Sequence, residues 1–109
     1  GSKHVATALL TVNKKYSKIQ SAINLKYKNE TISKIKKLKL TTYDYDRNHE
    51  PKNVKNGGST IEWGIKNAIK NSKKPPDIIY HKGDFGKEPM IIVFAETPDI
   101  VVKKILKII

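Results

Sequence analysis

Three polar segments of this 109-residue chain carry side chains that could bind phosphate, and the first is residues 1–4 (GSKH). Gly1 and Ser2 leave backbone N–H groups free where a helix is expected to begin, and a helix N-terminus favours anions. Lys3 and His4 could add charge-assisted hydrogen bonds to a phosphate. The alternative interpretation is a plain helix start, with Gly1 and Ser2 left over from cloning.

The second segment, residues 44–51 (DYDRNHEP), follows an expected strand and contains the only arginine of the chain, Arg47. A guanidinium can hold a phosphate through two parallel hydrogen bonds. Asp46 or Glu50 could orient that arginine or bind a metal ion. The alternative is a salt bridge that holds a surface loop, which is the commoner role of an Asp–Arg pair.

The third segment, residues 76–89, combines two glycines with charges of both signs. Its candidate ligand-binding residues are Gly83, Asp84, Gly86, Lys87 and Glu88, with His81 just before them. Glycines allow the backbone to approach a ligand closely, and the carboxylates suit Mg²⁺ or hydrogen bonds to a ring. A hairpin turn with its charges facing water is the equally weighted alternative.

Several catalytic constellations are missing from the sequence. There is no cysteine, no Walker phosphate loop, no GxGxxG and no HExxH, and the three histidines are scattered at positions 4, 49 and 81. Thiolate chemistry, a P-loop nucleotide site and a histidine-rich zinc site are therefore excluded, and no residue is assigned solely as a metal ligand.

The elements that must position these segments alternate between helix and strand. Apolar spacing predicts helices over residues 4–15, 29–38, 61–71 and 98–109, and β-branched or apolar runs predict strands over 21–28, 40–45, 77–81 and 90–95. Asn29, Ser59 and Thr97 are the expected N-caps, and Ser59 with Glu62 fits a capping box. Trp63 is expected to pack its helix onto the sheet. This alternation is typical of a layered α/β fold in one domain.

The formal charge of +12 invites a polyanion as partner, but 21 of the 22 basic residues are lysines, and these are dispersed along the chain. Nucleic-acid interfaces favour arginine and interleaved aromatic residues, so we interpret most of these lysines as a solvated coat and do not expect nucleic acid as a partner. No apolar run approaches the ~20 residues that span a membrane, and no signal peptide opens the chain. We expect a cytoplasmic protein with no membrane partner.

Five stretches in this order, GSKHVA, AINLKY, DRNHEP, GGSTIEWGIKNAI and PDIIYHKGDFGKEPMIIVF, resemble the archaeal-type thiamine-phosphate synthase family, ThiN. The resemblance runs along essentially the whole chain. It implies a three-layer α/β/α fold with a mixed sheet, similar to the class II aldolase (AraD-like) fold. It also implies a transferase that joins hydroxymethylpyrimidine diphosphate to hydroxyethylthiazole phosphate, which forms thiamine phosphate and releases pyrophosphate.

The family resemblance also suggests roles for residues of this chain. It implies phosphate or pyrophosphate contacts from Ser2, Lys3 and His4, further anion contacts from Arg47 and Lys87, and a ligand hydrogen bond from Asn24. His4 and Arg47 are the expected catalytic cations, because pyrophosphate leaves with several negative charges. The expected supporting residues, which position cations, read the pyrimidine amine or bind Mg²⁺, are Asp46, Glu50, Asp84 and Glu88.

The family module normally continues upstream of GSKHVA, so residues 1–109 are expected to be one ThiN-like domain that lacks its N-terminal part. A fused hydroxymethylpyrimidine phosphate kinase is the expected neighbour, a homo-oligomer stays open, and so does the activity of this piece alone. The alternative function is a thiamine-phosphate-sensing domain of a transcriptional regulator.

Overall fold

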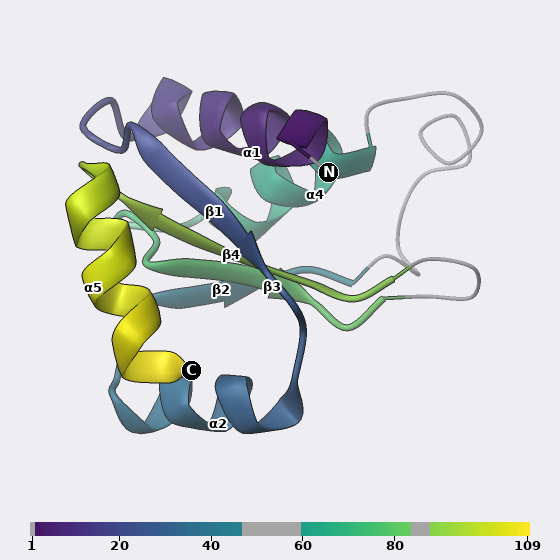
Figure 1. The fold of residues 1–109 in the computed structure, drawn as a ribbon. Coiled ribbons are helices and arrows are strands. Elements are labelled where there is room, and N and C mark those ends of the chain that lie inside the picture. The colour runs from purple at the N-terminus through teal and green to yellow at the C-terminus, as the bar shows by residue number, and fades with distance from the viewer. Residues whose placement is uncertain (1, 47–59, 84–87) are drawn as a thin grey trace.

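The computed structural model describes residues 2–46, 60–83 and 88–109, which form a four-stranded sheet between two layers of helices (Figure 1). The strands are β1 (Ser21–Leu25), β2 (Thr42–Asp44), β3 (Ile78–His81) and β4 (Met90–Ala95), in the order β1-β4-β3-β2. β2 and β3 are parallel, whereas β4 is antiparallel to both of its neighbours. The predicted mixed sheet is confirmed.

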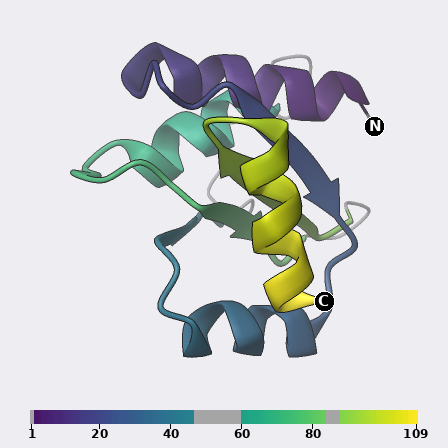
Figure 2. The same ribbon diagram turned by 60° about the vertical axis from the view of Figure 1, so that its left-hand side comes forward.

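Helices cover both faces of this sheet (Figures 1 and 2). α1 (Ser2–Lys15) and α4 (Thr60–Ile69) lie on one face, and α2 (Asn29–Lys37) and α5 (Pro98–Ile108) lie on the other. The described part of the chain is therefore an α/β protein in three layers, as predicted. None of its helices is long and apolar enough to cross a membrane.

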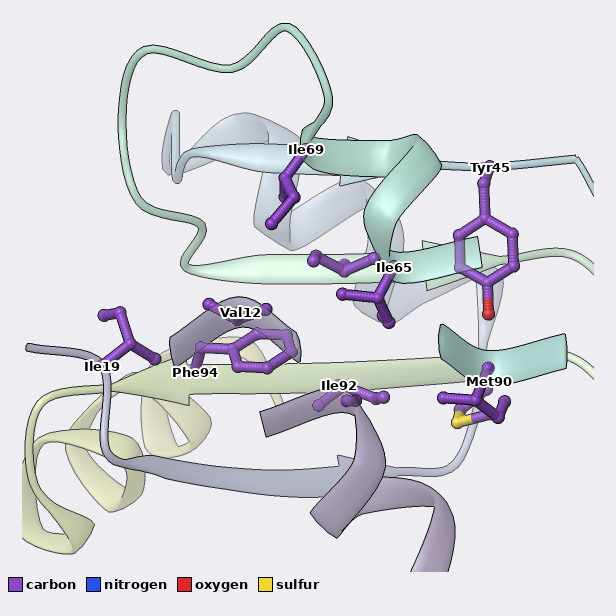
Figure 3. Packing of buried hydrophobic residues seen from close by; sticks show 11 residues of the cluster. Val12, Ile19, Tyr45, Ile65, Ile69, Met90, Ile92 and Phe94 are labelled. Atoms are coloured by element: carbon purple, nitrogen blue, oxygen red, sulfur yellow. The ribbon is translucent and has the colours of Figure 1, made fainter. Parts of the chain in front are cut away.

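Strand β4 supplies the centre of two hydrophobic cores. All six of its residues are buried. Because successive side chains of a strand point to opposite faces, Met90, Ile92 and Phe94 pack against α1 and α4, and Ile91, Val93 and Ala95 pack against α2 and α5. Figure 3 shows the first of these clusters. The uninterrupted apolar run at 90–95 thus does mark a strand buried on both faces.

The helix starts agree with the sequence in one case and differ in another. Thr97 caps α5, since its hydroxyl accepts a hydrogen bond from the Ile100 N–H at 3.3 Å and Pro98 takes the first turn. The prediction of Asn29 as N-cap was wrong. Lys28 is the N-cap, because its carbonyl accepts the hydrogen bond from the Ile32 N–H and Asn29 is the first helical residue. The side chain of Lys28 makes no capping hydrogen bond. Ser59, the third expected cap, lies outside the described residues.

The strands are shorter than expected at their ends. β1 stops at Leu25 rather than at residue 28, and β2 spans three residues instead of six, because each strand is limited by the neighbour with which it pairs. Trp63 is half-buried, with its ring centroid 6.3 Å from that of Tyr45 in an edge-to-face contact, and it packs against the first core as predicted.

One polar cluster ties the sheet to α5, and we call it the Asp77 cluster (Thr41, Asp77, Phe94 and Lys104). The Asp77 carboxylate accepts from the Thr41 N–H at 2.7 Å and forms an ion pair of 2.7 Å with Lys104. The Lys104 ammonium also donates to the Phe94 carbonyl at 2.7 Å. These contacts fix the beginning of β2 and β3 and the end of β4 to one helix.

Candidate functional site at the carboxyl end of the sheet

β1, β2 and β3 all run in the same direction, so their C-terminal ends and the beginning of β4 lie at one end of the sheet, which we call the carboxyl end. The first turns of α1 and α4 face the same side (Figure 1). Ligands of open α/β sheets bind beyond the carboxyl ends of the strands, and helix N-termini attract anions. The candidate site therefore lies here.

A pocket of about 490 Å³ opens beyond β2 and β3, and we call it the β2–β3 pocket. It is lined by Asp44, Tyr45, Asp46, Asn67, Tyr80, Lys82 and Gly83. Two of the predicted site residues, Asp46 and Gly83, meet in this pocket although they are far apart in the sequence. The described lining contains two carboxylates and one ammonium group.

Tyr80 is a buried tyrosine of this pocket whose hydroxyl is a candidate for ligand binding. Its side chain is only 7% exposed, and its hydroxyl makes no hydrogen bond within the described part of the chain. Asp44 is its neighbour across the β2–β3 pair. Burial, followed by the negative charge of Asp44 and then by Tyr27, raises the pKa of Tyr80, so the phenol stays protonated and available as a donor.

Tyr45 is held by a close approach to helix α4. A side chain at Gly64 would place its Cβ less than 3.0 Å from three atoms of the Tyr45 ring, so only glycine fits. The Tyr45 ring also lies beside the ring of His81, with centroids 5.1 Å apart. Tyr45 is part of the first core, as Figure 3 shows, and it also lines the β2–β3 pocket.

His81 stabilises the turn that follows β3. Its side chain is 2% exposed, and Nδ1 accepts a hydrogen bond from the Gly83 N–H at 3.0 Å. Gly83 has a φ of 85°, a left-handed conformation that favours glycine. An Nδ1 that accepts this hydrogen bond carries no proton, so the described contact of His81 serves the turn.

A second pocket, of about 580 Å³, lies between the end of β1 and the beginning of β4, and we call it the β1–β4 pocket. It is lined by Asn24, Leu25, Lys26, Tyr27, Glu88 and Pro89. Asn24 and Glu88, both predicted site residues, meet here. The rings of Tyr27 and Tyr80 lie 6.3 Å apart, so the two pockets are neighbours.

The expected anion-binding residues at the N-terminus lie in the first turn of α1, where Lys3 and His4 are exposed. Ser2 is helical, and its side chain is not described. Neither described pocket is lined by Lys3 or His4. Arg47, Glu50, Asp84, Gly86 and Lys87 lie outside the described residues. Ligand contacts of all these residues stay predictions.

Comparison with known proteins identifies the family. The family model described as thiamine-phosphate synthase ThiN matches residues 1–107. The chain belongs to the ThiN family. It is 37% identical over 109 residues to thiamine-phosphate synthase ThiN of Methanothermobacter thermautotrophicus, and 41% identical over 104 residues to the bifunctional thiamine biosynthesis protein ThiDN of Methanocaldococcus jannaschii. These matches cover 99% and 95% of the chain.

A solved structure has the same fold as this chain. The crystal structure of the C-terminal domain of a phosphomethylpyrimidine kinase matches 97% of this chain with a TM-score of 0.88 and 43% identity. The chain spans 60% of that solved domain, 57% of the ThiN relative and 24% of the ThiDN relative. The predicted membership and the predicted occurrence of the family in kinase fusions are both confirmed.

The sequence analysis did not identify several residues that line the two pockets at the carboxyl end of the sheet. They are Tyr45, Asn67, Tyr80 and Lys82 in the β2–β3 pocket and Lys26 and Tyr27 in the β1–β4 pocket. Tyr80 reads as an ordinary buried strand residue in the apolar run IIYH, and only the pairing with Asp44 distinguishes it. Lys26 and Lys82 each follow the last residue of a strand, and that position was the available signal.

The described residues can be searched for side chains that could bind a metal ion. Within residues 2–46, 60–83 and 88–109, no three His, Cys, Asp or Glu side chains cluster in a way that could hold a metal ion. The described side chains alone would therefore not complete the coordination of a Mg²⁺ ion, and further ligands, such as substrate phosphate oxygens, would be needed. Mg²⁺ commonly binds in this way, through substrate phosphates and one or two carboxylates.

Proposed function

We propose that the protein containing this chain is a thiamine-phosphate synthase of thiamine biosynthesis. The observation that carries the proposal is the match of residues 1–107 to the ThiN family. Both curated relatives are named for thiamine synthesis. The proposal concerns the whole protein, because the chain spans little more than half of its ThiN relative.

The proposed reaction joins the two phosphorylated substrates through one carbon–nitrogen bond. The C–O bond of hydroxymethylpyrimidine diphosphate breaks, and its electron pair leaves with pyrophosphate. The lone pair of the thiazole nitrogen of hydroxyethylthiazole phosphate forms the new C–N bond, which leaves the positive charge on the thiazolium product. The protein must therefore stabilise the charge on the leaving group and hold the two heterocycles in line.

The carboxyl end offers groups for both tasks. Lys3 and His4, in the first turn of α1, supply cations beside a helix N-terminus, and Arg47 and Lys87 are the further cations of the proposal. Lys26 and Asn24 in the β1–β4 pocket can donate to phosphate oxygens. If Mg²⁺ accompanies the diphosphate, Glu88 is the described carboxylate of that pocket that could bind it.

The wider setting of the enzyme belongs to the same proposal. The four-stranded mixed sheet between two helix layers is compatible with the class II aldolase (AraD-like) architecture. We extend to this protein the cytoplasmic location and, from the ThiDN relative, the fusion to a kinase domain.

The experiment combines the two phosphorylated substrates with the purified full-length protein, with and without Mg²⁺, and measures thiamine phosphate and pyrophosphate. We expect equal amounts of the two products, and the absence of thiamine phosphate would overturn the proposal.

The role of His4 is tested by substitution. His4→Ala should lower kcat at least a hundredfold, with the unfolding midpoint unchanged, because it removes a contact to the reacting phosphate. Lys14→Ala, near the other end of α1, is the matched control and should leave kcat unchanged. Equal loss of stability and activity in His4→Ala would make His4 a structural residue.

A further inference from the structure

The described lining of the β2–β3 pocket is rich in polar groups. It includes the carboxylates of Asp44 and Asp46 and the ammonium group of Lys82. Asp44 lies next to Tyr80 across the β2–β3 pair, so these two side chains can bind one ligand together.

The donor and acceptor pattern of the pocket is more specific than its charge. Asp44 and Tyr80 are paired across the parallel strands β2 and β3, so their side chains leave the same face of the sheet side by side. The Asp44 carboxylate can only accept hydrogen bonds, and the phenol of Tyr80, kept protonated, can donate one. A ligand that fits this pair presents a donor next to an acceptor.

Tyr80 provides a hydroxyl at the pocket that a ligand can reach. The residue is 7% exposed and lines the pocket, and its hydroxyl has no hydrogen-bond partner among the described residues. That hydroxyl is not among the buried polar atoms without a partner, so water reaches it and a ligand in the pocket can replace that water. The amide of Asn67, from α4, adds both a donor and an acceptor to the same lining.

We propose that the β2–β3 pocket binds the aminopyrimidine ring of the diphosphate substrate, with Asp44 accepting from the exocyclic amine and Tyr80 donating to the adjacent ring nitrogen. This assignment rests on the proposed function and deepens it. The thiazole ring of the other substrate fits less well, because its ring nitrogen is an acceptor and the ring has no N–H donor for Asp44. The neighbouring β1–β4 pocket, with Lys26, is left for phosphate.

The test measures binding of two separate probes to the chain by isothermal titration calorimetry. The probes are unphosphorylated hydroxymethylpyrimidine and inorganic pyrophosphate. In Asp44→Ala and Tyr80→Phe we expect the Kd for hydroxymethylpyrimidine to rise at least tenfold and the Kd for pyrophosphate to stay within twofold of wild type. The matched controls are Asp99→Ala, exposed in the first turn of α5, and Tyr43→Phe, whose hydroxyl donates to the Lys74 carbonyl at 2.8 Å outside the pocket. Neither control should change either Kd.

A chemical deletion sharpens the assignment of Asp44. A hydroxymethylpyrimidine analogue that lacks the exocyclic amine should bind wild type about tenfold more weakly, and Asp44→Ala, which has no side-chain acceptor, should bind both compounds equally. Independent, multiplicative losses would overturn the contact between Asp44 and the amine.

The remaining outcomes also decide the proposal. Equal weakening of both probes, weakening of pyrophosphate alone, or no hydroxymethylpyrimidine binding to wild type would each overturn it. These measurements record binding and not turnover, so failure of the pocket assignment can be distinguished from failure of the proposed reaction. Hydroxymethylpyrimidine binding that depends on Asp44 and Tyr80, without formation of thiamine phosphate by the full-length protein, would leave the pocket assigned and overturn only the synthase function.

Discussion

An aspartate lies at each end of the sheet, and the two differ in their contacts. At the beginning of β3, both carboxylate oxygens of Asp77 are engaged, one by the Thr41 N–H and the other by Lys104. At the end of β2, Asp44 is exposed, and within the described residues its neighbour Tyr80 has a hydroxyl without a hydrogen bond. Satisfied polar groups stabilise a fold, whereas exposed or unsatisfied ones remain available to a ligand. The first end therefore anchors the layers, and the second is free for chemistry.

The largest loss of stability is expected when the Asp77 cluster is disrupted. Asp77→Ala should lower the free energy of unfolding by about 2–3 kcal/mol, because it removes an acceptor of charged and backbone donors and leaves a largely buried Lys104 without its ion pair. Urea denaturation would measure this loss. Asp44→Ala is the matched variant at the other end and should change the unfolding free energy by less than about 0.5 kcal/mol, because Asp44 is exposed. Equal losses in the two variants would refute the division between the ends.

The next largest effect concerns the contact between Gly64 of α4 and the ring of Tyr45, which lies at the carboxyl end. Gly64→Ala should destabilise the protein by about 1–3 kcal/mol, because the new methyl group would overlap the ring of Tyr45. Combining it with Tyr45→Ala should give a smaller loss than the sum of the two single variants, since the overlapping ring is gone. Additive losses in denaturant unfolding would show that the two residues do not interact.

A smaller effect appears at alkaline pH. The raised pKa of Tyr80 means that the folded state holds the phenolic proton more tightly than the unfolded chain does. The resulting stabilisation is fully present below the ordinary tyrosine pKa of about 10 and is lost as the pH rises through the higher folded value. Wild type should therefore lose more stability between pH 9 and pH 11 than Tyr80→Phe does. Tyr43→Phe should retain the wild-type slope, and identical slopes in all three proteins would contradict the origin assigned to the shift.

The smallest effect is expected away from both ends. Glu62 and Lys66 form an exposed ion pair of 2.8 Å on α4, and the hydrogen bond from Lys66 lowers the pKa of Glu62. Its small contribution is present above pH 4.5 and is lost as the pH falls through the lowered pKa. Glu62→Gln should shift Tm at neutral pH by less than about 1 °C, as measured by calorimetry. A larger shift would show that this surface pair carries stability that we assign to the Asp77 cluster.

Local sequence signals predicted the elements well. The apolar run 90–95 and the Thr97–Pro98 start of α5 carry their own structural information, so β4 and α5 appear where expected. Strand ends were less predictable because they depend on the partner strand. Asn29 has good capping chemistry, yet the helix begins one residue too early for its side chain to act as the cap.

The candidate site was predictable only in part. Asp46, Gly83, Asn24 and Glu88 were recognisable because polar residues and glycine at strand ends suggest ligand contacts, and the structure places them in two neighbouring pockets. Tyr80 was not recognisable, because its distinction depends on the pairing of β3 with Asp44 of β2, which lies 36 residues earlier in the sequence. Such a juxtaposition is a property of tertiary structure and leaves no local pattern.

The alternation of β4 between the two cores makes this strand tolerant of one kind of mutation and intolerant of another. Exchange of one aliphatic residue for another changes a single contact in one helix layer. Insertion or deletion of one residue would move Ile91 and Val93 into the space of Ile92 and Phe94 and would exchange the contents of both cores. Length variation in related proteins should therefore be found in the connections between elements, while the number of residues in β4 stays constant.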